Sequence, residues 1–177
     1  MKGLVISMSR TKTYIAADWD NDYEVVEKLY EWNKSDFFIL HFLDAHSERQ
    51  ARDSSKYCSI KKSLKERLDI SKTFVLIVGS NTTSITKGSC KYCNRYSSWY
   101  SKCLDSGTLD FRSYIQYECE KALEAGIKIV VIYNYANVYK TKCPEALRNV
   151  GTHLPFYYYL NDKCYYNYAA IKKAIME

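Results

Sequence analysis

The chain of 177 residues lacks a hydrophobic run long enough to cross a membrane. Its longest apolar stretch, Phe37 to Leu43, is interrupted by His41, whereas a spanning helix needs about 20 apolar residues. Met1 to Met8 hold too short an apolar stretch for a signal peptide, and no cleavage-like site follows. We therefore expect a cytoplasmic protein with no membrane partner.

The glycine-rich loops of common nucleotide-binding folds are also missing. Neither GxGxxG nor GxxxxGK[ST] follows any apolar run, which argues against a Rossmann dehydrogenase and a P-loop NTPase. A phosphate-accepting receiver domain needs an aspartate after its third strand, where this chain has Gly79 and Ser80. An electron-transfer flavodoxin needs a hydroxyl-rich loop after its first strand, where this chain is acidic, Asp18 to Asp22.

The net charge of +6 shows no concentration that would indicate a specific nucleic-acid partner. Basic residues occur singly or in short pairs such as Lys61-Lys62 and Lys172-Lys173, with acidic residues between them. The 18 tyrosines are more unusual. They reflect either an AT-rich genome or half-buried surfaces, self-association faces and aromatic ligand pockets, because tyrosine joins an apolar ring to a polar tip.

The number of cysteines is odd, seven, which fits reduced thiols better than a disulfide framework. Cys90, Cys93 and Cys103 form the most suggestive group, but no fourth zinc ligand follows at a familiar spacing. We assign no metal site, and whether this group binds a metal stays open.

Four continuous apolar runs alternate with helical patterns along the chain. The runs cover residues 13–17, 37–43, 73–78 and 127–133, and a fifth at 155–160 starts with a proline. Helical spacing predicts helices over about 22–32, around Ile60 to Leu68, around Glu118, and over 166–176. Asp22 suits the N-cap of the first helix, and Gly126 suits a helix C-cap.

Continuous runs are typical of strands that are buried on both faces of a parallel sheet. We predict an α/β fold, a flavodoxin-like doubly wound sheet of five parallel strands in the order 2-1-3-4-5. Residues 1–177 would form one domain with a Cys/Tyr-rich insertion at about 82–110. In such a sheet, ligands bind at the carboxyl ends of the strands. Here these ends are the acidic turn at 18–22, Asp44 to His46, Gly79 to Asn81, and Tyr133-Asn134.

The predicted helix after the third run carries an unusual carboxylate. At 100° per residue, Phe111, Ile115, Cys119 and Ala122 fall within an arc of roughly 80°, the expected buried face. Glu118 lies about 20° outside that arc, whereas Glu120 and Glu124 lie on the solvent side. A carboxylate at the border of the core is either paired, for example with Lys121 or Arg112, or functional.

The stretch Tyr114-Ile115-Gln116-Tyr117-Glu118, followed by Ala122 to Gly126 and an apolar strand, resembles a motif of Toll/interleukin-1-receptor-like (TIR) proteins. It is similar to the segment W-V-x-x-E, then small or apolar residues, then a strand, and Tyr114 stands in place of the tryptophan. The first run with its acidic turn, and the run that ends at Gly79-Ser80, fit the same pattern. The chain thus resembles the stand-alone TIR-like subunits of bacterial Thoeris anti-phage systems over about residues 10–160.

The resemblance implies an enzyme that cleaves the nicotinamide–ribose bond of NAD and releases a cyclic ADP-ribose isomer as an antiviral signal. Glu118 would be catalytic, NAD would be the substrate, and no further cofactor is implied. The substrate-binding candidates are Asp18, Trp19, Asp44, Ser80, Asn81, Arg112 and Tyr114. Trp19 and Tyr114 would stack on a base, Ser80 and Asn81 would hold hydroxyls, and Arg112 would meet the pyrophosphate. Implied partners are a second copy of the chain, a downstream effector reached through the signal, and a phage-derived trigger.

Two other functions remain open at this point. One is a non-catalytic TIR interaction module that recruits partners through tyrosine-rich faces. The other is an enzyme similar to the nucleoside deoxyribosyltransferases, which use a glutamate on a similar fold, although their flanking motifs are not recognisable in this sequence.

Overall fold

Four parallel strands form the central sheet, in the order β1-β2-β5-β6. They are β1 (Lys12–Ala16), β2 (Ser71–Val78), β5 (Lys128–Tyr133) and β6 (Thr152–Pro155). The structure is a computed structural model and describes residues 10–45, 56–104 and 106–177, so the expectations for Met1 to Met8 and for His46 lie outside it. The central strand β2 is fully buried from Phe74 to Val78, which confirms the parallel sheet expected from its continuous apolar run.

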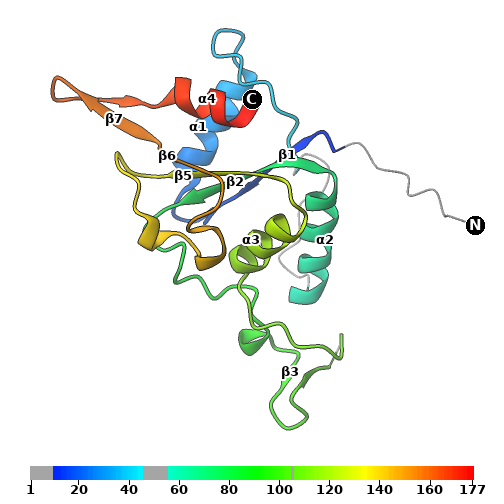
Figure 1. The fold of residues 1–177 in the computed structure, drawn as a ribbon. Coiled ribbons are helices and arrows are strands. Elements are labelled where there is room, and N and C mark those ends of the chain that lie inside the picture. The colour runs from blue at the N-terminus through cyan, green and yellow to red at the C-terminus, as the bar shows by residue number, and fades with distance from the viewer. Residues whose placement is uncertain (1–9, 46–55, 105) are drawn as a thin grey trace, which may run out of the picture.

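Helices cover both faces of this sheet, and Figure 1 shows them above and below the strands. One face carries α1 (Tyr23–Lys34) and α4 (Tyr168–Met176), and the other carries α2 (Tyr57–Asp69) and α3 (Tyr114–Glu124). Alternate residues of a strand point to opposite faces. Leu76 therefore packs with α2 and α3, whereas Val75 and Ile77 pack with α1 and α4. The α/β, doubly wound prediction is confirmed.

The strand predicted at 37–43 is wrong in its extent. Its position beside β1 is retained, but the pairing is reduced to one parallel bridge between Thr13 and Asp44. The Asn33 side chain forms hydrogen bonds with both backbone groups of Phe42. Its Oδ1 accepts one of 2.7 Å from the Phe42 nitrogen, and its Nδ2 donates one of 3.0 Å to the Phe42 oxygen. Ile39 also adopts a φ of +53°, which interrupts an extended chain.

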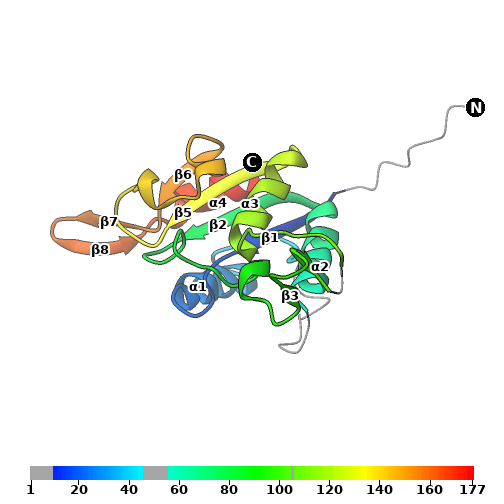
Figure 2. The same ribbon diagram turned by 90° about the horizontal axis from the view of Figure 1, so that it is seen from below.

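The fifth predicted strand, 155–160, is displaced. The residues that pair with β5 are those of β6, which ends at Pro155. The next segment, β7 (Tyr157–Leu160), instead pairs antiparallel with β8 (Lys163–Tyr166). Asn161 and Asp162 both have positive φ, as a two-residue hairpin turn requires. Figure 2 shows this hairpin projecting from the body of the molecule.

The connection from β2 to α3 contains the predicted insertion. It includes a short 3-10 helix, η1 (Cys90–Tyr92), and the antiparallel pair β3 (Tyr96–Ser97) and β4 (Lys102–Cys103). Two further 3-10 helices, η2 (Lys140–Lys142) and η3 (Glu145–Leu147), join β5 to β6.

All seven cysteines are free thiols. Within the described ranges, no three His, Cys, Asp or Glu side chains gather closely enough to hold a metal ion. No helix in the same ranges is both long and apolar enough to cross a membrane.

Candidate functional site

Helix α3 fixes the position of Glu118 from its first turn. Ser113 and Gln116 form a capping box, in which each side chain accepts a hydrogen bond from the other residue's backbone N–H. Ile115 and Cys119 are buried against the sheet, and Glu118 between them is only 6% exposed. The predicted border position of Glu118 is therefore a buried one.

Phe111 was assigned to the same buried face, and that assignment is wrong. The residue precedes the first turn of α3 and is 54% exposed. The helical periodicity that placed it cannot apply upstream of the N-cap, Ser113.

Glu118 is held by the sheet and not by an ion pair with any described residue. The hydroxyl of Tyr14 in β1 donates a hydrogen bond to Glu118 Oε1. Burial raises the pKa of the Glu118 carboxyl to about 7, although the Tyr14 hydrogen bond and the positive charge of Arg67 act to lower it. Arg67 itself is buried on α2, and its Nε and Nη2 have no hydrogen-bond partner. Lys121 and Arg112, the partners considered from the sequence, bond instead to Glu124 and Glu120.

Tyr114 stands one helical turn before Glu118 and packs against α2 and the insertion. Its ring meets Tyr57 edge to face, with centroids 5.7 Å apart, and a Cβ on Gly88 would collide with it. Its backbone nitrogen lies 2.9 Å from the oxygen of Lys87, whereas its buried hydroxyl has no hydrogen-bond partner. Three cavities of about 670, 340 and 320 Å³ on the described surface are lined by other residues and not by Glu118.

A second polar group, here called the strand-end cluster, lies where β1, β2 and β5 end. It consists of Asp18, Asp22, Gly79, Thr82 and Asn134. Asp22 is 2% exposed. Its Oδ1 accepts a hydrogen bond of 2.9 Å from Asn134 Nδ2, and its Oδ2 is buried without a partner. Burial is the main reason why the pKa of Asp22 is raised, with Asp18 adding to the effect.

The cluster corrects the role expected for Asp22 and explains the adjacent glycine. Asp22 occupies the N-cap position of α1, but its side chain makes no capping bond. A side chain at Gly79 would overlap the Asp22 carboxylate, and the Gly79 nitrogen lies 2.8 Å from Thr82 Oγ1. The two loops therefore approach each other at the strand order's switch point, where doubly wound sheets bind ligands.

The structure brings part of the predicted substrate site together at this edge. Asp18 is buried and accepts hydrogen bonds from Asn21 Nδ2 at 2.6 Å and from the Asp20 nitrogen at 3.3 Å. Trp19 is 43% exposed. Ser80 and Asn81 are exposed in the turn after β2. These four residues occupy the loops that follow two neighbouring strands.

Asp44 does not join them. It lies beside Thr13, near the start of β1 and not at its end. Its carboxylate accepts a hydrogen bond of 2.8 Å from the Tyr30 hydroxyl. The second run therefore ends beside the start of β1, whereas the sequence predicted that it would end at the edge where the carboxyl ends of the strands meet.

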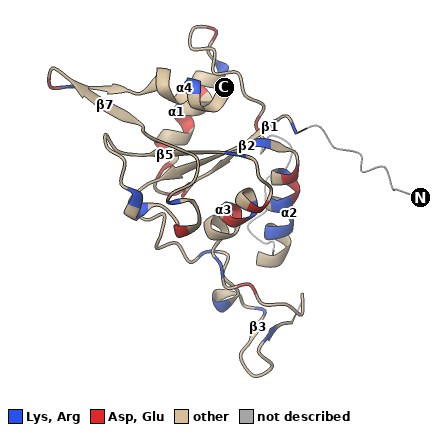
Figure 3. Cartoon of the chain, in the orientation of Figure 1, with Lys and Arg blue, Asp and Glu red and all other residues tan. Residues whose placement is uncertain are grey.

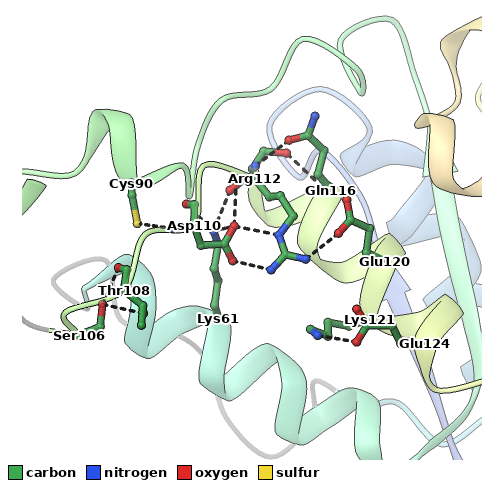
Figure 4. A network of polar contacts seen from close by, with 11 residues as sticks. Lys61, Cys90, Ser106, Thr108, Asp110, Arg112, Gln116, Glu120, Lys121 and Glu124 are labelled. Carbon is green, nitrogen blue, oxygen red and sulfur yellow. Dashed lines mark hydrogen bonds and ion pairs between the residues drawn. The ribbon is translucent and has the colours of Figure 1, made fainter. Parts of the chain in front are cut away.

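Arg112 is committed to other protein groups. Figure 4 shows its guanidinium between Asp110 and Glu120, with nitrogen–oxygen distances of 2.8 Å and 2.6 Å. Its guanidinium carbon also lies 4.9 Å from the centre of the Tyr117 ring. Burial opposes ionisation of Asp110, but the hydrogen bonds from Arg112 and the charge of Lys61 outweigh it and lower the pKa of Asp110 to about 2. A pyrophosphate would have to compete with these two carboxylates for Arg112.

Several residues of the site gave no usable signal in the sequence. Tyr14 lies inside an apolar run and Arg67 inside an ordinary amphipathic helix, and only folding brings both to Glu118. Asn134 was recognised as a strand end, but its bond to Asp22 spans 112 positions. The S-x-x-Q pattern of Ser113 and Gln116 was a local signal that could have located the start of α3.

A comparison with curated proteins gives no match. A comparison with protein-family models matches the N-terminal part of the chain, which holds β1, α1, α2, β2 and the start of the insertion. This part includes Asp18, Trp19, Ser80 and Asn81 but stops before Glu118, so it is independent of the helix that carried the resemblance. Residues 14–87 match the family described as Thoeris protein ThsB, TIR-like domain, which supports a TIR-like, ThsB-type domain protein.

Proposed function

We propose that this chain is a TIR-like enzyme that cleaves the nicotinamide–ribose bond of NAD, with Glu118 as the catalytic residue. The observation that carries the proposal is the environment of Glu118. Its carboxylate is buried, its pKa is raised by that burial to about 7, and a tyrosine hydroxyl holds it. Perturbed carboxylates of this kind are concentrated at functional sites. The match of residues 14–87 to a ThsB-type TIR-like domain supports the same reaction class.

The chemistry needs one carboxylate and no general acid. When the bond between the nicotinamide nitrogen and C1′ breaks, the electron pair goes to a ring that was cationic and becomes neutral. The ribose is left with oxocarbenium character, as in glycoside hydrolysis. An ionised Glu118 beside that sugar would stabilise the developing positive charge and accept hydrogen bonds from its hydroxyls. With a pKa of about 7, a large fraction of the carboxyl groups is ionised at neutral pH.

The product depends on which nucleophile adds to C1′. Water gives ADP-ribose and releases one proton. An adenine or ribose atom of the same molecule gives a cyclic ADP-ribose isomer, provided that the pocket folds the substrate back and excludes water. We propose the cyclic product, which would act as an anti-phage signal on a downstream effector.

The proposal requires a route to Glu118, which lines none of the three cavities described above. Tyr114, one turn before Glu118 on the same helix, contacts Tyr57 and packs against Gly88. We propose that self-association or a phage-derived trigger opens this contact and that the isolated chain is a resting form. The exposed tyrosines of the β7–β8 hairpin, Tyr158, Tyr159, Tyr165 and Tyr166, would form part of the association surface.

Nicotinamide release from NAD tests the proposal. The full chain, Glu118→Gln and Glu124→Gln are each incubated with NAD, alone and with lysate from phage-infected cells. Glutamine has the shape of glutamate and still accepts the Tyr14 hydrogen bond, so the fold should survive. Glu124 lies on the exposed side of the same helix and bonds to Lys121. Release by the wild type and by Glu124→Gln, with a loss of at least a hundredfold in Glu118→Gln, would support the proposal.

A non-catalytic TIR interaction module is the second candidate function. It is favoured by the enclosure of Glu118, which lets the Tyr14–Glu118 bond serve as a structural tie between β1 and α3. Under this alternative no form of the protein releases nicotinamide with any trigger. The thermal stability of Glu118→Gln would then be the only property that changes.

A further inference from the structure

The insertion before α3 concentrates charge of one sign, which the chain as a whole does not. Residues 87–102 carry four basic residues and no acidic residue. The four are Lys87, Lys91, Arg95 and Lys102, and all are exposed. Residues 87–104, here called the arm, project from the body below α3 in Figure 1. Figure 3 marks basic residues along the arm around β3. The even spread of charge inferred from the sequence therefore fails in this segment.

The arm also exposes large aromatic rings among these cations. Trp99 is 88% exposed, Tyr100 is 65% exposed and Tyr92 is 57% exposed. The Lys102 ammonium lies 5.4 Å from the centre of the Tyr100 ring, and the Lys91 ammonium lies 5.9 Å from that of Tyr92. Large aromatic rings are usually buried, because removing their apolar surface from water is favourable. Rings that stay exposed beside cations are typical of a binding surface.

The base of the arm is fixed to the body by hydrogen bonds. The Lys61 ammonium on α2 lies 2.8 Å from the oxygen of Arg112 and 3.2 Å from that of Asp110. The Cys90 nitrogen lies 3.0 Å from the same Asp110 oxygen. Strands β3 and β4 then pair Tyr96 with Cys103. A ligand would meet a segment anchored at its base by these hydrogen bonds, and such preorganisation reduces the entropy cost of binding.

We propose that the arm binds single-stranded nucleic acid without sequence preference, with Trp99 and Tyr100 stacking on bases and Lys91 and Lys102 contacting phosphates. Ring faces interleaved with cations are the two elements of such sites, because every base has a stackable face and every nucleotide a negative charge. A membrane surface fits less well. Leu104 is the large aliphatic side chain that the arm exposes, and the arm contains no amphipathic helix of the kind that lies in a bilayer interface.

Fluorescence anisotropy of a labelled oligothymidylate of about 20 nucleotides, titrated with the full chain at low salt, tests the proposal. We expect saturable binding that Trp99→Ala/Tyr100→Ala weakens by about tenfold or more. Lys91→Gln/Lys102→Gln should weaken it and reduce the slope of log affinity against log salt by about 1.4, because each phosphate contact contributes about 0.7. The matched control is Tyr23→Ala/Phe37→Ala, which removes two exposed rings that lie outside the arm and should leave the affinity unchanged.

Three results would overturn the proposal. The first is no binding at low salt. The second is binding that Trp99→Ala/Tyr100→Ala leaves intact, because such binding would come from general charge attraction and not from base stacking. The third is binding of phosphatidylserine vesicles, but not of the oligonucleotide, through the same residues. All four arm positions are exposed, so circular dichroism should confirm that the variants fold. The inference does not depend on NAD cleavage. Nicotinamide release can be measured separately with the same variants.

Discussion

The Tyr14 hydroxyl donates a hydrogen bond to Glu118 Oε1 across 104 positions of sequence, and both residues are buried. The bond joins the first strand of the sheet to the helix that carries the candidate catalytic carboxylate. Burial and the hydrogen bond act in opposite directions on the Glu118 carboxyl: burial raises its pKa to about 7, while the hydrogen bond from Tyr14 acts to lower it. This balance gives the protein a measurable pH dependence.

The first prediction concerns Glu118 and pH. The folded protein keeps the Glu118 proton up to a pH of about 7, whereas the unfolded chain loses it near 4.5. The folded state therefore binds more protons between these values, and the free energy of unfolding falls as pH rises through them, by about 3 kcal/mol. We expect Glu118→Gln to lose this fall, so that it gains stability relative to wild type from pH 4.5 to pH 7. Urea unfolding at several pH values measures it, and an unchanged pH profile would contradict the buried position.

The second prediction concerns Tyr14, the donor of the hydrogen bond to Glu118. Tyr14→Phe leaves a buried carboxyl without its hydrogen bond and should lower the free energy of unfolding by about 1–3 kcal/mol. The pKa of Glu118 should rise above its wild-type value, because the bond to the ionised form is lost. NMR titration of the carboxyl carbon follows the pKa. Tyr23→Phe, which removes an exposed bond to Glu27, serves as the control and should change the stability little.

The third prediction concerns the base of the arm. Asp110 has a pKa of about 2, below its ordinary 3.8, so it contributes stability above pH 4 that is lost as pH falls toward 2. Asp110→Asn should cost about 2 kcal/mol at pH 7, because Lys61 and Arg112 lose their partner. The difference from wild type should shrink in acid. Asp69→Asn breaks an exposed pair with Lys65 and should cost under about 1 kcal/mol.

The fourth prediction concerns Asn33, whose side chain forms the hydrogen bonds with Phe42 in the run that was predicted to be a strand. Asn33→Ala frees the backbone nitrogen and oxygen of Phe42 and should lower the free energy of unfolding by about 1–3 kcal/mol. The Phe42 amide should also exchange its hydrogen faster with solvent. An exposed asparagine, Asn149, provides the matched control as Asn149→Ala. Equal exchange at Phe42 in both variants would show that the amide has another source of protection.

The main elements of the fold could be predicted because they follow from local patterns. The apolar run 73–78 is buried on both faces as β2, and the stripe of Val25, Val26, Leu29 and Trp32 faces the core from α1. Gly126 follows the last turn of α3 with a φ of +61°, as expected of a helix end. Such patterns work because side-chain period and burial are properties of neighbouring residues.

The run at 37–43 and the hairpin at 157–166 could not be assigned by the same reasoning. Both are apolar enough for strands of the main sheet, and their fate depends on partners elsewhere. Asn33 bonds to the backbone nitrogen and oxygen of Phe42, and a two-residue turn pairs β7 with β8, so that β7 does not extend β6. Apolar composition sets the tendency to be buried, but it does not select the partner strand.

By itself the sequence determined the layers of the molecule and the face of α3 on which Glu118 lies, since both depend on spacing along the chain. Only the tertiary structure decided what Glu118 touches. Tyr14 reaches it from β1 and Arg67 lies near it on α2, whereas Arg112, six positions before Glu118 in sequence, bonds to Asp110 and Glu120 instead. Hydrogen bonds and charge depend on distance in space, and no local pattern encodes contacts between segments a hundred residues apart.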